Sequence, residues 1–308
     1  MSLVEKALKK LQDARREAGT GPDTLRRIGG AESTEVAKVA AAIPTPLRSE
    51  SPPPVAIVRS SKYVTVDIGA LRAAGLLAVE DQERRVASEY RQIKRPLIAG
   101  ALGRGTPAVH NGRIIMVASA LPGEGKSFTT VNLAFNMALE KDTSVLLVDA
   151  DLPKPQISGV FGVSREPGLV DALLDETQDV ESLIIPTSVR GLSLLSAGRP
   201  DANATELLAS DRMQRLVTSL VTADPRRIVL CDSPPLLLTT ESRVLATAVG
   251  QIVIVVRAES TTHQAVVDAL ACIPEGKSVG LVLNQCRTAP AHEYYGYGEY
   301  GYHGRTAE

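Results

Sequence analysis

Residues 120–127 combine the side chains that bind nucleotide phosphates. The segment follows an apolar run at 114–119, precedes a helical pattern, and reads Ala120-Leu121-Pro122-Gly123-Glu124-Gly125-Lys126-Ser127. Its glycines let backbone N–H groups surround phosphate oxygens, and the helix N-terminus adds a positive dipole end. Lys126 supplies charge to the β- and γ-phosphates, and the Ser127 hydroxyl can bind Mg²⁺. We therefore predict an ATP site formed by residues 120–127 together with Phe128.

The loop departs at one position from the GxxxxGK[ST] pattern of phosphate-binding loops. Ala120 stands where the first glycine is expected. The alternative is an ordinary glycine-containing loop, but a small residue at this position still permits the turn. The prediction of a phosphate site is therefore kept.

Three aspartates follow apolar runs elsewhere in the chain. Asp149 and Asp151 come after the run at 145–148, and Asp232 comes after the run at 228–231. In an open parallel sheet, ligands lie outside the carboxyl ends of the strands, so we expect these carboxylates to converge on the 120–127 loop. A single aspartate at such a position can be only a helix cap. Three of them beside a phosphate loop favour a catalytic site.

Strand and helix patterns alternate around these residues. Short apolar runs lie at 114–119, 145–150, 192–196, 228–231, 252–256 and 279–283, and helical patterns lie near 126–140, 204–222, 239–248 and 261–272. This alternation predicts the α/β fold of a P-loop NTPase, with a mostly parallel sheet and helices on both faces. An earlier helix is expected from about Asp81 to Arg95, ending before Pro96.

The composition divides the chain into five segments. Residues 1–18 have the spacing of a basic amphipathic helix, which could dock on its own domain, on a neighbouring subunit or on an anionic membrane surface. A Pro/Ser-rich linker follows at 19–61. We expect a helical segment at 62–103, the nucleotide-binding domain at 104–287 and a flexible tyrosine-rich tail at 288–308.

The overall charge and the cysteines narrow the class of protein. The 308 residues include 34 Lys plus Arg and 35 Asp plus Glu, so no net basic charge draws the chain onto nucleic acid. Three cysteines, with no CxxC spacing, fit a reducing cytosol. No segment approaches the ~20 apolar residues of a membrane span, and the charged start is unlike a signal peptide. The expected location is cytoplasmic.

These motifs, in this order, resemble the bacterial tyrosine kinases of the P-loop type, the BY-kinases that govern exopolysaccharide synthesis. Asp149-Ala150-Asp151 looks like their Walker A′ motif, and Asp232-Ser233-Pro234-Pro235 looks like their Walker B motif. The chain is most similar to the tyrosine autokinases that accompany exosortase and PEP-CTERM gene clusters. That similarity lies in the MSLVEKAL start and in residues 89–96, 204–208 and 236–240.

Two positions depart from the family pattern. The family's A′ motif carries Arg two residues after its second Asp, where this chain has Pro153 followed by Lys154, a candidate substitute. The family's oligomerisation helix has an ExxRxxR pattern. The corresponding residues here are Ser88, Arg91 and Lys94, and the nearest glutamate, Glu89, is displaced by one.

The resemblance implies roles for the site residues. Lys126, Asp149, Asp151 and Asp232 would be catalytic, with Asp149 as the base that accepts the tyrosine proton. Mg²⁺ would be held by Ser127 and, directly or through water, by Asp149 and Asp232, while Asp151 supports the metal or the attacking group. Asn284, at the end of the last expected strand, is a candidate contact for adenine, although such a residue is more often part of a turn.

The resemblance also implies a substrate and partners. Five of the seven tyrosines lie in the tail, and we expect them to be phosphorylated by a neighbouring subunit: Tyr294, Tyr295, Tyr297, Tyr300 and Tyr302. Glycines between them keep the backbone pliable. The expected partners are further copies of the chain in a homo-oligomer such as a ring, a separate membrane chain-length-determinant protein that activates the kinase, and a tyrosine phosphatase. Such a partner would recruit the chain to the inner face of the membrane.

Two other functions compete with the kinase hypothesis. A partition or cell-division ATPase has the same topology, but it carries a signature lysine early in the phosphate loop, where this chain has Leu121. Such ATPases also lack a tyrosine-cluster tail. The second alternative is a non-enzymatic scaffold, in which the tail is an aromatic low-complexity segment that binds a partner.

Overall fold

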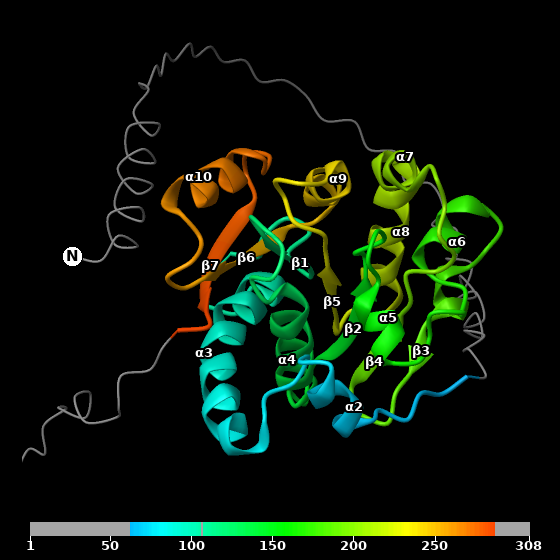
Figure 1. Ribbon diagram of the computed structural model, residues 1–308. Helices are drawn as coiled ribbons and strands as arrows, with labels where there is room; N and C mark the ends of the chain where they lie inside the picture. The colour runs from blue at the N-terminus through cyan, green and yellow to red at the C-terminus, as the bar shows by residue number, and fades with distance from the viewer. Residues whose placement is uncertain (1–61, 106, 287–308) are drawn as a thin grey trace, which may run out of the picture. The chain divides into compact units, whose positions relative to one another are not determined.

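The computed structural model describes residues 62–105 and 107–286, in which strands and helices alternate (Figure 1). The predictions for the helix at 1–18, the linker at 19–61 and the tail at 288–308 lie outside the described residues. The same holds for the five tail tyrosines.

A seven-stranded sheet in the order β3-β4-β2-β5-β1-β6-β7 forms the centre of the described chain. Its strands are β1 (Ile114–Ser119), β2 (Ser144–Asp149), β3 (Ile185–Pro186), β4 (Leu192–Leu195), β5 (Arg227–Asp232), β6 (Gln251–Arg257) and β7 (Ser278–Asn284). All neighbours pair in parallel except β3 and β4. The predicted α/β fold with a mostly parallel sheet is confirmed, and the two-residue β3 is an addition that the sequence pattern did not predict.

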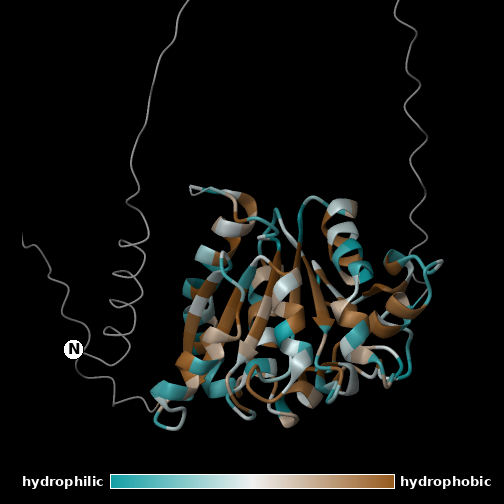
Figure 2. Ribbon diagram, turned by 90° about the horizontal axis from the view of Figure 1, so that it is seen from above, coloured by the Kyte–Doolittle hydropathy of each residue, from teal (hydrophilic) through white to brown (hydrophobic). Residues whose placement is uncertain are grey.

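Helices cover both faces of the sheet because successive strand residues point to opposite sides. On β1, Ile114 and Met116 belong to one hydrophobic cluster, while Ile115 and Val117 belong to the other. The first cluster includes residues of α6 (Leu169–Leu174), α7 (Ala204–Ala209), α8 (Asp211–Ala223), α9 (Thr240–Ala248) and α10 (His263–Ala271). The second includes residues of α2 (Ile68–Ala73), α3 (Glu83–Leu102), α4 (Lys126–Ala138) and α5 (Gln156–Val160). Figure 2 shows the hydrophobic strands enclosed by these helices.

Helix α3 continues through Pro96, so the prediction that it ends at Arg95 is wrong. Pro96 is exposed, and the turn beyond it buries Leu97 and Ile98 in the second cluster. This burial outweighs the loss of one helical hydrogen bond. The helix ends instead at Leu102, and Gly103, with a φ of 66°, forms its left-handed cap.

The helical pattern at 204–222 forms two helices rather than one. Ser210 separates α7 from α8 with an extended backbone, φ −73° and ψ 153°. Its hydroxyl donates to the Leu207 carbonyl, and its own carbonyl accepts from the Met213 N–H. Serine competes with the helical backbone for hydrogen bonds in this way, which explains the break.

Residues 62–103 pack against α4, the helix that follows the 120–127 loop. Asn132 donates to the Leu76 carbonyl and Asn136 to the Ala87 carbonyl, both at 3.0 Å. The buried Lys94 donates to the Asn136 carbonyl at 2.8 Å. This segment therefore shares one core with the loop and its helix.

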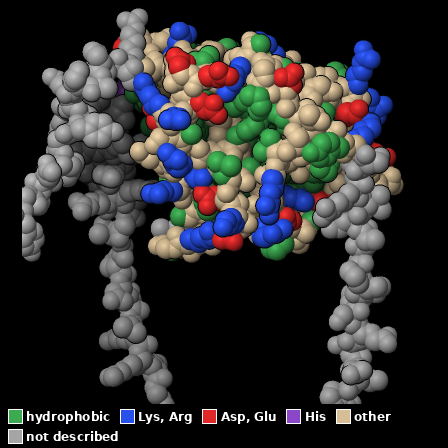
Figure 3. Space-filling model, turned by 90° about the horizontal axis from the view of Figure 1, so that it is seen from below, with side chains coloured by type: hydrophobic (Ala, Val, Ile, Leu, Met, Phe, Trp, Pro, Cys, Tyr) green, Lys and Arg blue, Asp and Glu red, His purple; other side chains and the backbone are tan. Residues whose placement is uncertain are grey.

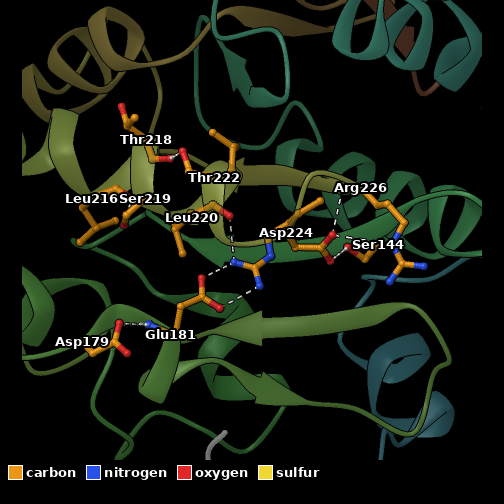
Figure 4. Close-up of polar contacts among 12 residues, drawn as sticks. Ser144, Asp179, Glu181, Leu216, Thr218, Ser219, Leu220, Thr222, Asp224 and Arg226 are labelled. Atoms are coloured by element: carbon orange, nitrogen blue, oxygen red, sulfur yellow. Dashed lines mark hydrogen bonds and ion pairs between the residues drawn. The ribbon is translucent and has the colours of Figure 1, made fainter. Parts of the chain in front are cut away.

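A buried ion pair ties the 3-10 helix η2 (Val180–Leu183) to the start of β5. The Arg227 guanidinium binds both carboxylate oxygens of Glu181 and donates to the Leu220 carbonyl at 2.9 Å. The side chains of Arg227 and Glu181 are only 14% and 13% exposed. Figure 4 shows Glu181 and Leu220 at this junction, with Ser144, Asp224 and Arg226 nearby.

We expect Arg227→Ala to lower the free energy of unfolding by about 3 kcal/mol, because it leaves the Glu181 carboxylate buried without its partner. Urea denaturation measures the change. The matched control is Arg226→Ala, whose side chain is 67% exposed, and we expect it to cost less than about 1 kcal/mol. Equal losses for the two variants would contradict a stabilising role for the buried pair.

The face of the molecule shown in Figure 3 carries charges of both signs. Lys and Arg side chains alternate there with Asp and Glu and with apolar patches.

In the described ranges, none of the helices combines the length and the apolar composition needed to cross a lipid bilayer.

Candidate nucleotide and phosphoryl-transfer site

The 120–127 loop joins the carboxyl end of β1 to the N-terminus of α4. Gly123 and Gly125 have φ values of 77° and 95°, which glycine adopts without steric cost. A Cβ atom at Gly125 would lie 2.1 Å from Asn284 Nδ2, so a larger residue would push the Asn284 side chain away from the loop. Ala120 is buried and its φ is not positive. An alanine is therefore tolerated in the first position of the motif.

Glu124 and Asn284 hold the loop in shape. The Glu124 carboxylate, in a residue only 2% exposed, accepts from the Leu121 N–H at 2.7 Å and from the Thr261 hydroxyl. Asn284 Nδ2 donates to the Glu124 carbonyl at 2.9 Å. These contacts tie the loop to the segment after β6 and to the end of β7. The contact of Asn284 with adenine stays a prediction.

Ser127 and Asp232 meet beside the first turn of α4. Ser127 Oγ donates to Asp232 Oδ2 at 2.7 Å, and Thr130 Oγ1 donates to Asp232 Oδ1 at 2.9 Å. Lys126 begins the helix and is 7% exposed. Its positive charge acts on the carboxylates of Asp151 and Asp232. A lysine, a hydroxyl and a carboxylate therefore gather where a nucleotide phosphate would lie.

Asp149 lies directly opposite Asp232 in the parallel pairing of β2 with β5. It is fully buried, and its Oδ2 accepts from the Ser158 N–H at 2.6 Å. Its Oδ1 has no hydrogen-bond partner within the part of the chain that the structure describes. Asp151, two residues further on, accepts from the Lys154 N–H at 3.2 Å. The structure thus brings the three aspartates and the loop to one edge of the sheet.

The remaining residues predicted for the site lie around this centre. Leu121 and Pro122 are exposed at the tip of the loop. The Phe128 ring packs edge-on against Tyr90 of α3, with the ring centroids 6.5 Å apart. Burial raises the pKa of Asp151, and the positive charges of Lys126 and of the exposed Lys154 oppose this rise. Lys154 therefore acts electrostatically on Asp151, although it stands one position later than the family's arginine.

Three contributors were missed by the sequence reasoning. Thr130 binds Asp232 and lies three residues after Ser127 on the same face of α4, a spacing that could have identified it. Ser158 binds Asp149 through its backbone, and Thr261 binds Glu124 from the segment after β6. These last two leave no sequence signal, because Ser158 acts through its backbone N–H from α5 and Thr261 acts from a loop 137 residues away along the chain.

The oxygen atoms at this edge suit a hard divalent cation. Ser127 Oγ and one carboxylate oxygen of Asp232 are already in contact, and the unpartnered Oδ1 of Asp149 is a buried anionic acceptor. In residues 62–105 and 107–286, no three His, Cys, Asp or Glu side chains cluster as a metal cage. Mg²⁺ typically binds through one or two protein oxygens, water and substrate phosphates. The residues present therefore fit Mg²⁺ bound together with a nucleotide.

The two facing aspartates have raised pKa values. Burial raises the pKa of Asp232 to about 7, and the charge of Asp149 adds to this, although hydrogen bonds from Ser127 and Thr130 oppose it. Burial likewise raises the pKa of Asp149 to about 6, against the hydrogen bonds from Ser158. Two carboxylates packed this closely need a cation to ionise together.

We expect the metal-free protein to lose stability as the pH rises from about 4 to 7. In this range the folded protein holds protons that the unfolded chain has released, so the free energy of unfolding falls, by ~1.4 kcal/mol for each unit by which a pKa is raised. Asp232→Asn removes one of these charges. At pH 8 in chelator, thermal denaturation of this variant is expected at a higher temperature than that of the wild type.

The control for this prediction is the same pair of proteins at pH 4. Both carry a neutral side chain at position 232 there, so their midpoints are expected to agree. A variant that is less stable than the wild type to the same extent at both pH values would contradict the explanation.

The fold and the site together define a P-loop NTPase. A ParA family model, described as an NUBPL iron-transfer P-loop NTPase, matches residues 110–275, more than half of the 308 residues. The chain therefore belongs to the ParA-type P-loop NTPases.

Within this class, the chain is similar to bacterial tyrosine kinases. The chain is 28% identical over 232 residues to tyrosine-protein kinase YwqD of Bacillus subtilis (strain 168), a match that covers 75% of this chain and 94% of the relative. It is 35% identical over 149 residues to the putative tyrosine-protein kinase EpsB of Ralstonia nicotianae, which covers 48% of this chain but only 19% of that protein. The solved kinase domain of Escherichia coli tyrosine kinase ETK is 30% identical, with a TM-score of 0.52 over 60% of this chain and 72% of that one. The predicted resemblance to the bacterial tyrosine kinases is confirmed.

Proposed function

We propose that the chain is an ATP-dependent protein-tyrosine autokinase that phosphorylates its own C-terminal tyrosine cluster. The observation that carries the proposal is the buried pair of Asp149 and Asp232 facing each other beside Lys126 and Ser127. This arrangement places the groups that bind phosphate next to a carboxylate that can accept a proton. The similarity to bacterial tyrosine kinases supports tyrosine as the acceptor.

Each side chain has a distinct task in the proposed reaction. Lys126 and the backbone N–H groups of the loop neutralise charge on the transferring phosphoryl group. Ser127, Asp149 and Asp232 would hold Mg²⁺. When bound, Mg²⁺ would neutralise charge on the phosphate oxygens, so that they repel the attacking hydroxyl less. Tyrosine has an ordinary pKa of ~10, so its proton needs an acceptor. Asp149 fits this task, since its buried Oδ1 has no hydrogen-bond partner among the described residues and is open to a proton.

The acceptors are Tyr294, Tyr295, Tyr297, Tyr300 and Tyr302, presented by a neighbouring subunit. The tail follows β7 at the edge of the sheet, and β7 is separated from β2 by four strand intervals, or about 19 Å. The nine residues from Gln285 to Tyr294 span at most ~30 Å. This reach would allow Tyr294 to approach its own site, so transfer between subunits is proposed from the similarity to the bacterial tyrosine kinases rather than from the length of the tail.

The same proposal includes the assembly, the cellular process and the partners of the kinase. The kinase assembles as a homo-oligomer and regulates the synthesis, polymerisation or export of a bacterial exopolysaccharide at the inner face of the cell membrane. A separate membrane chain-length-determinant protein activates it, and a tyrosine phosphatase reverses the modification. No nucleic acid takes part.

Mapping the transferred phosphate tests the proposal. The purified full chain is incubated with Mg²⁺ and γ-labelled ATP, and modified residues are located by mass spectrometry. Label on Tyr294 to Tyr302 is the expected result. Free phosphate without labelled protein would instead favour an ATPase switch of the partition type, and neither product would favour a scaffold.

A further inference from the structure

Strand β7 is an open edge of the sheet. Among the described strands it pairs with β6 alone, and Figure 1 shows it at the end of the sheet. The opposite edge is protected: β3 is only two residues long, and Val64 lies beside it, donating to the Pro186 carbonyl at 3.0 Å and accepting from the Ser188 N–H at 2.9 Å. An unprotected edge offers its backbone groups to another chain.

The backbone groups of alternate β7 residues point away from β6. The Ser278 N–H donates to the Gly250 carbonyl at 3.2 Å, and the Asn284 carbonyl accepts from the Ala258 N–H at 2.9 Å. The even-numbered residues of β7 therefore bind β6. Because the direction of the backbone groups alternates along a strand, the odd-numbered residues face outward.

The outward residues of β7 are Val279, Leu281 and Leu283. Within the described part of the chain, their outward groups have one hydrogen-bond partner, the Cys286 thiol, whose Sγ lies 3.6 Å from the Leu283 carbonyl oxygen. Sulfur is a weak donor, so an amide N–H would displace it. The backbone of this edge is therefore ready to bind a further strand.

The side chains of β7 suit contact with another apolar strand. Val279 and Leu283 are 39% and 52% exposed, and they lie on the same face of the sheet as Leu281. From Ser278 to Asn284 the strand contains neither proline nor a charged residue. Proline and inward or edge-facing charges are the usual devices by which an edge strand avoids pairing.

The order of residues in β7 is complementary to itself. When two copies lie antiparallel about a twofold axis at Leu281, Val279 of each copy is opposite Leu283 of the other, as an isologous contact requires. All of these residues face outward, so each opposed pair can exchange both of its backbone hydrogen bonds. No charged residues oppose one another within the strands, so the repulsion that like charges cause is absent.

The edge is also large enough for a specific interface. Residues of α10 pack with Leu281 in the first hydrophobic cluster and residues of α3 pack with Val282 in the second, so helices flank β7 on both faces. The seven residues of β7 span about 23 Å. With the strand and a helix layer on each face, each about 10 Å thick, the edge offers roughly 700 Å² per copy, close to the ~800 Å² per partner of a standard interface.

We propose that β7 is a docking surface for β7 of a second copy of this chain, so that two sheets join antiparallel into one. In this arrangement the carboxyl edges of the two sheets point in opposite directions, and both 120–127 loops stay accessible. The proposal assigns a surface to the homo-oligomer of the proposed function, but the pairing itself does not depend on phosphoryl transfer.

Charging the two exposed side chains tests the proposal. Analytical ultracentrifugation of the full chain without nucleotide is expected to show a reversible dimer. Val279→Lys combined with Leu283→Lys places like charges opposite each other at both ends of the paired strands, and we expect it to weaken dimerisation about tenfold or more. The matched control is Leu139→Lys combined with Leu174→Lys, which charges two exposed leucines elsewhere and should dimerise as the wild type does.

A third double variant tests the antiparallel register. Val279→Lys combined with Leu283→Glu places the introduced lysine of each copy opposite the introduced glutamate of the other, so this variant is expected to dimerise about as tightly as the wild type. It has the same two positions changed as the two-lysine variant. Equal dissociation constants for these two variants would overturn the proposed pairing.

Hydrogen exchange of the wild type does not depend on the folding of any variant. The outward N–H groups of β7 are expected to exchange slowly at high protein concentration and rapidly on dilution. Slow exchange in a monomer at every concentration would mean that another part of the same chain covers the edge. Rapid exchange at every concentration would mean that the edge stays open, and either result would overturn the proposal.

The same proteins separate this inference from the proposed function. Labelling of residues 294–302 with Mg²⁺ and γ-labelled ATP measures the kinase reaction. A labelled tail in a wild type that stays monomeric would support the kinase and overturn the pairing of β7. Dimers that the two-lysine variant loses, without any labelling of the tail in the wild type, would support the pairing and overturn the kinase.

Discussion

Replacing Lys126 with alanine is expected to reduce ATP-dependent phosphorylation of the tail about a thousandfold. The side chain is 7% exposed, at the N-terminus of α4 where the loop closes. A charge held in a water-excluded site stabilises the transferring phosphoryl group far more than it would in water, and the loss of one such donor typically costs 10²- to 10³-fold. The loss of affinity for ATP adds to this effect.

Two further variants make the Lys126 result interpretable. Lys126→Met keeps an unbranched apolar side chain in the buried position, so a similar loss in this variant would exclude disturbed packing as the cause. Lys141→Ala removes an exposed lysine from the turn between α4 and β2. This control variant is expected to leave the rate of phosphorylation unchanged. Wild-type phosphorylation in both Lys126 variants would refute the proposed site.

Asp149→Asn is expected to lower the rate of tyrosine phosphorylation by about 10²- to 10⁴-fold, the range for removal of a general base. Asparagine has nearly the same shape, and its Oδ1 can still accept from the Ser158 N–H, which lies 2.6 Å from the aspartate oxygen in the native protein. It cannot take up the tyrosine proton. Single-turnover measurements with saturating ATP give the rate of the transfer step.

Metal dependence distinguishes the two tasks assigned to Asp149. If the residue acts mainly by holding Mg²⁺, higher Mg²⁺ concentrations restore the rate of Asp149→Asn, whereas the loss of a base is not restored. Asp142→Asn is the matched control, because the Asp142 side chain is 78% exposed. An Asp149→Asn variant as fast as Asp142→Asn would exclude both tasks.

Much of the site could be predicted because its signals are contiguous in the chain. The loop from Ala120 to Ser127 lies between one strand and one helix, so residue types and spacing are enough to identify it. Asp149 and Asp232 each end an apolar run, and the rule for parallel sheets places such ends at one edge. The sequence could not show how far α3 extends, because the burial of Leu97 and Ile98 in a cluster with distant helices and strands overrides the local signal of Pro96.

The sequence by itself determined the class of fold, the phosphate loop and the acidic residues at the strand ends, since these depend on short-range order and on the alternation of strands and helices. Only the tertiary structure decided what those residues meet. The pairing of Asp149 with Asp232 and the contacts of Glu124 with Thr261 and Asn284 join segments many residues apart. Such contacts follow from the order of strands in the sheet, and this order is set by the packing of the whole domain rather than by any one stretch of chain.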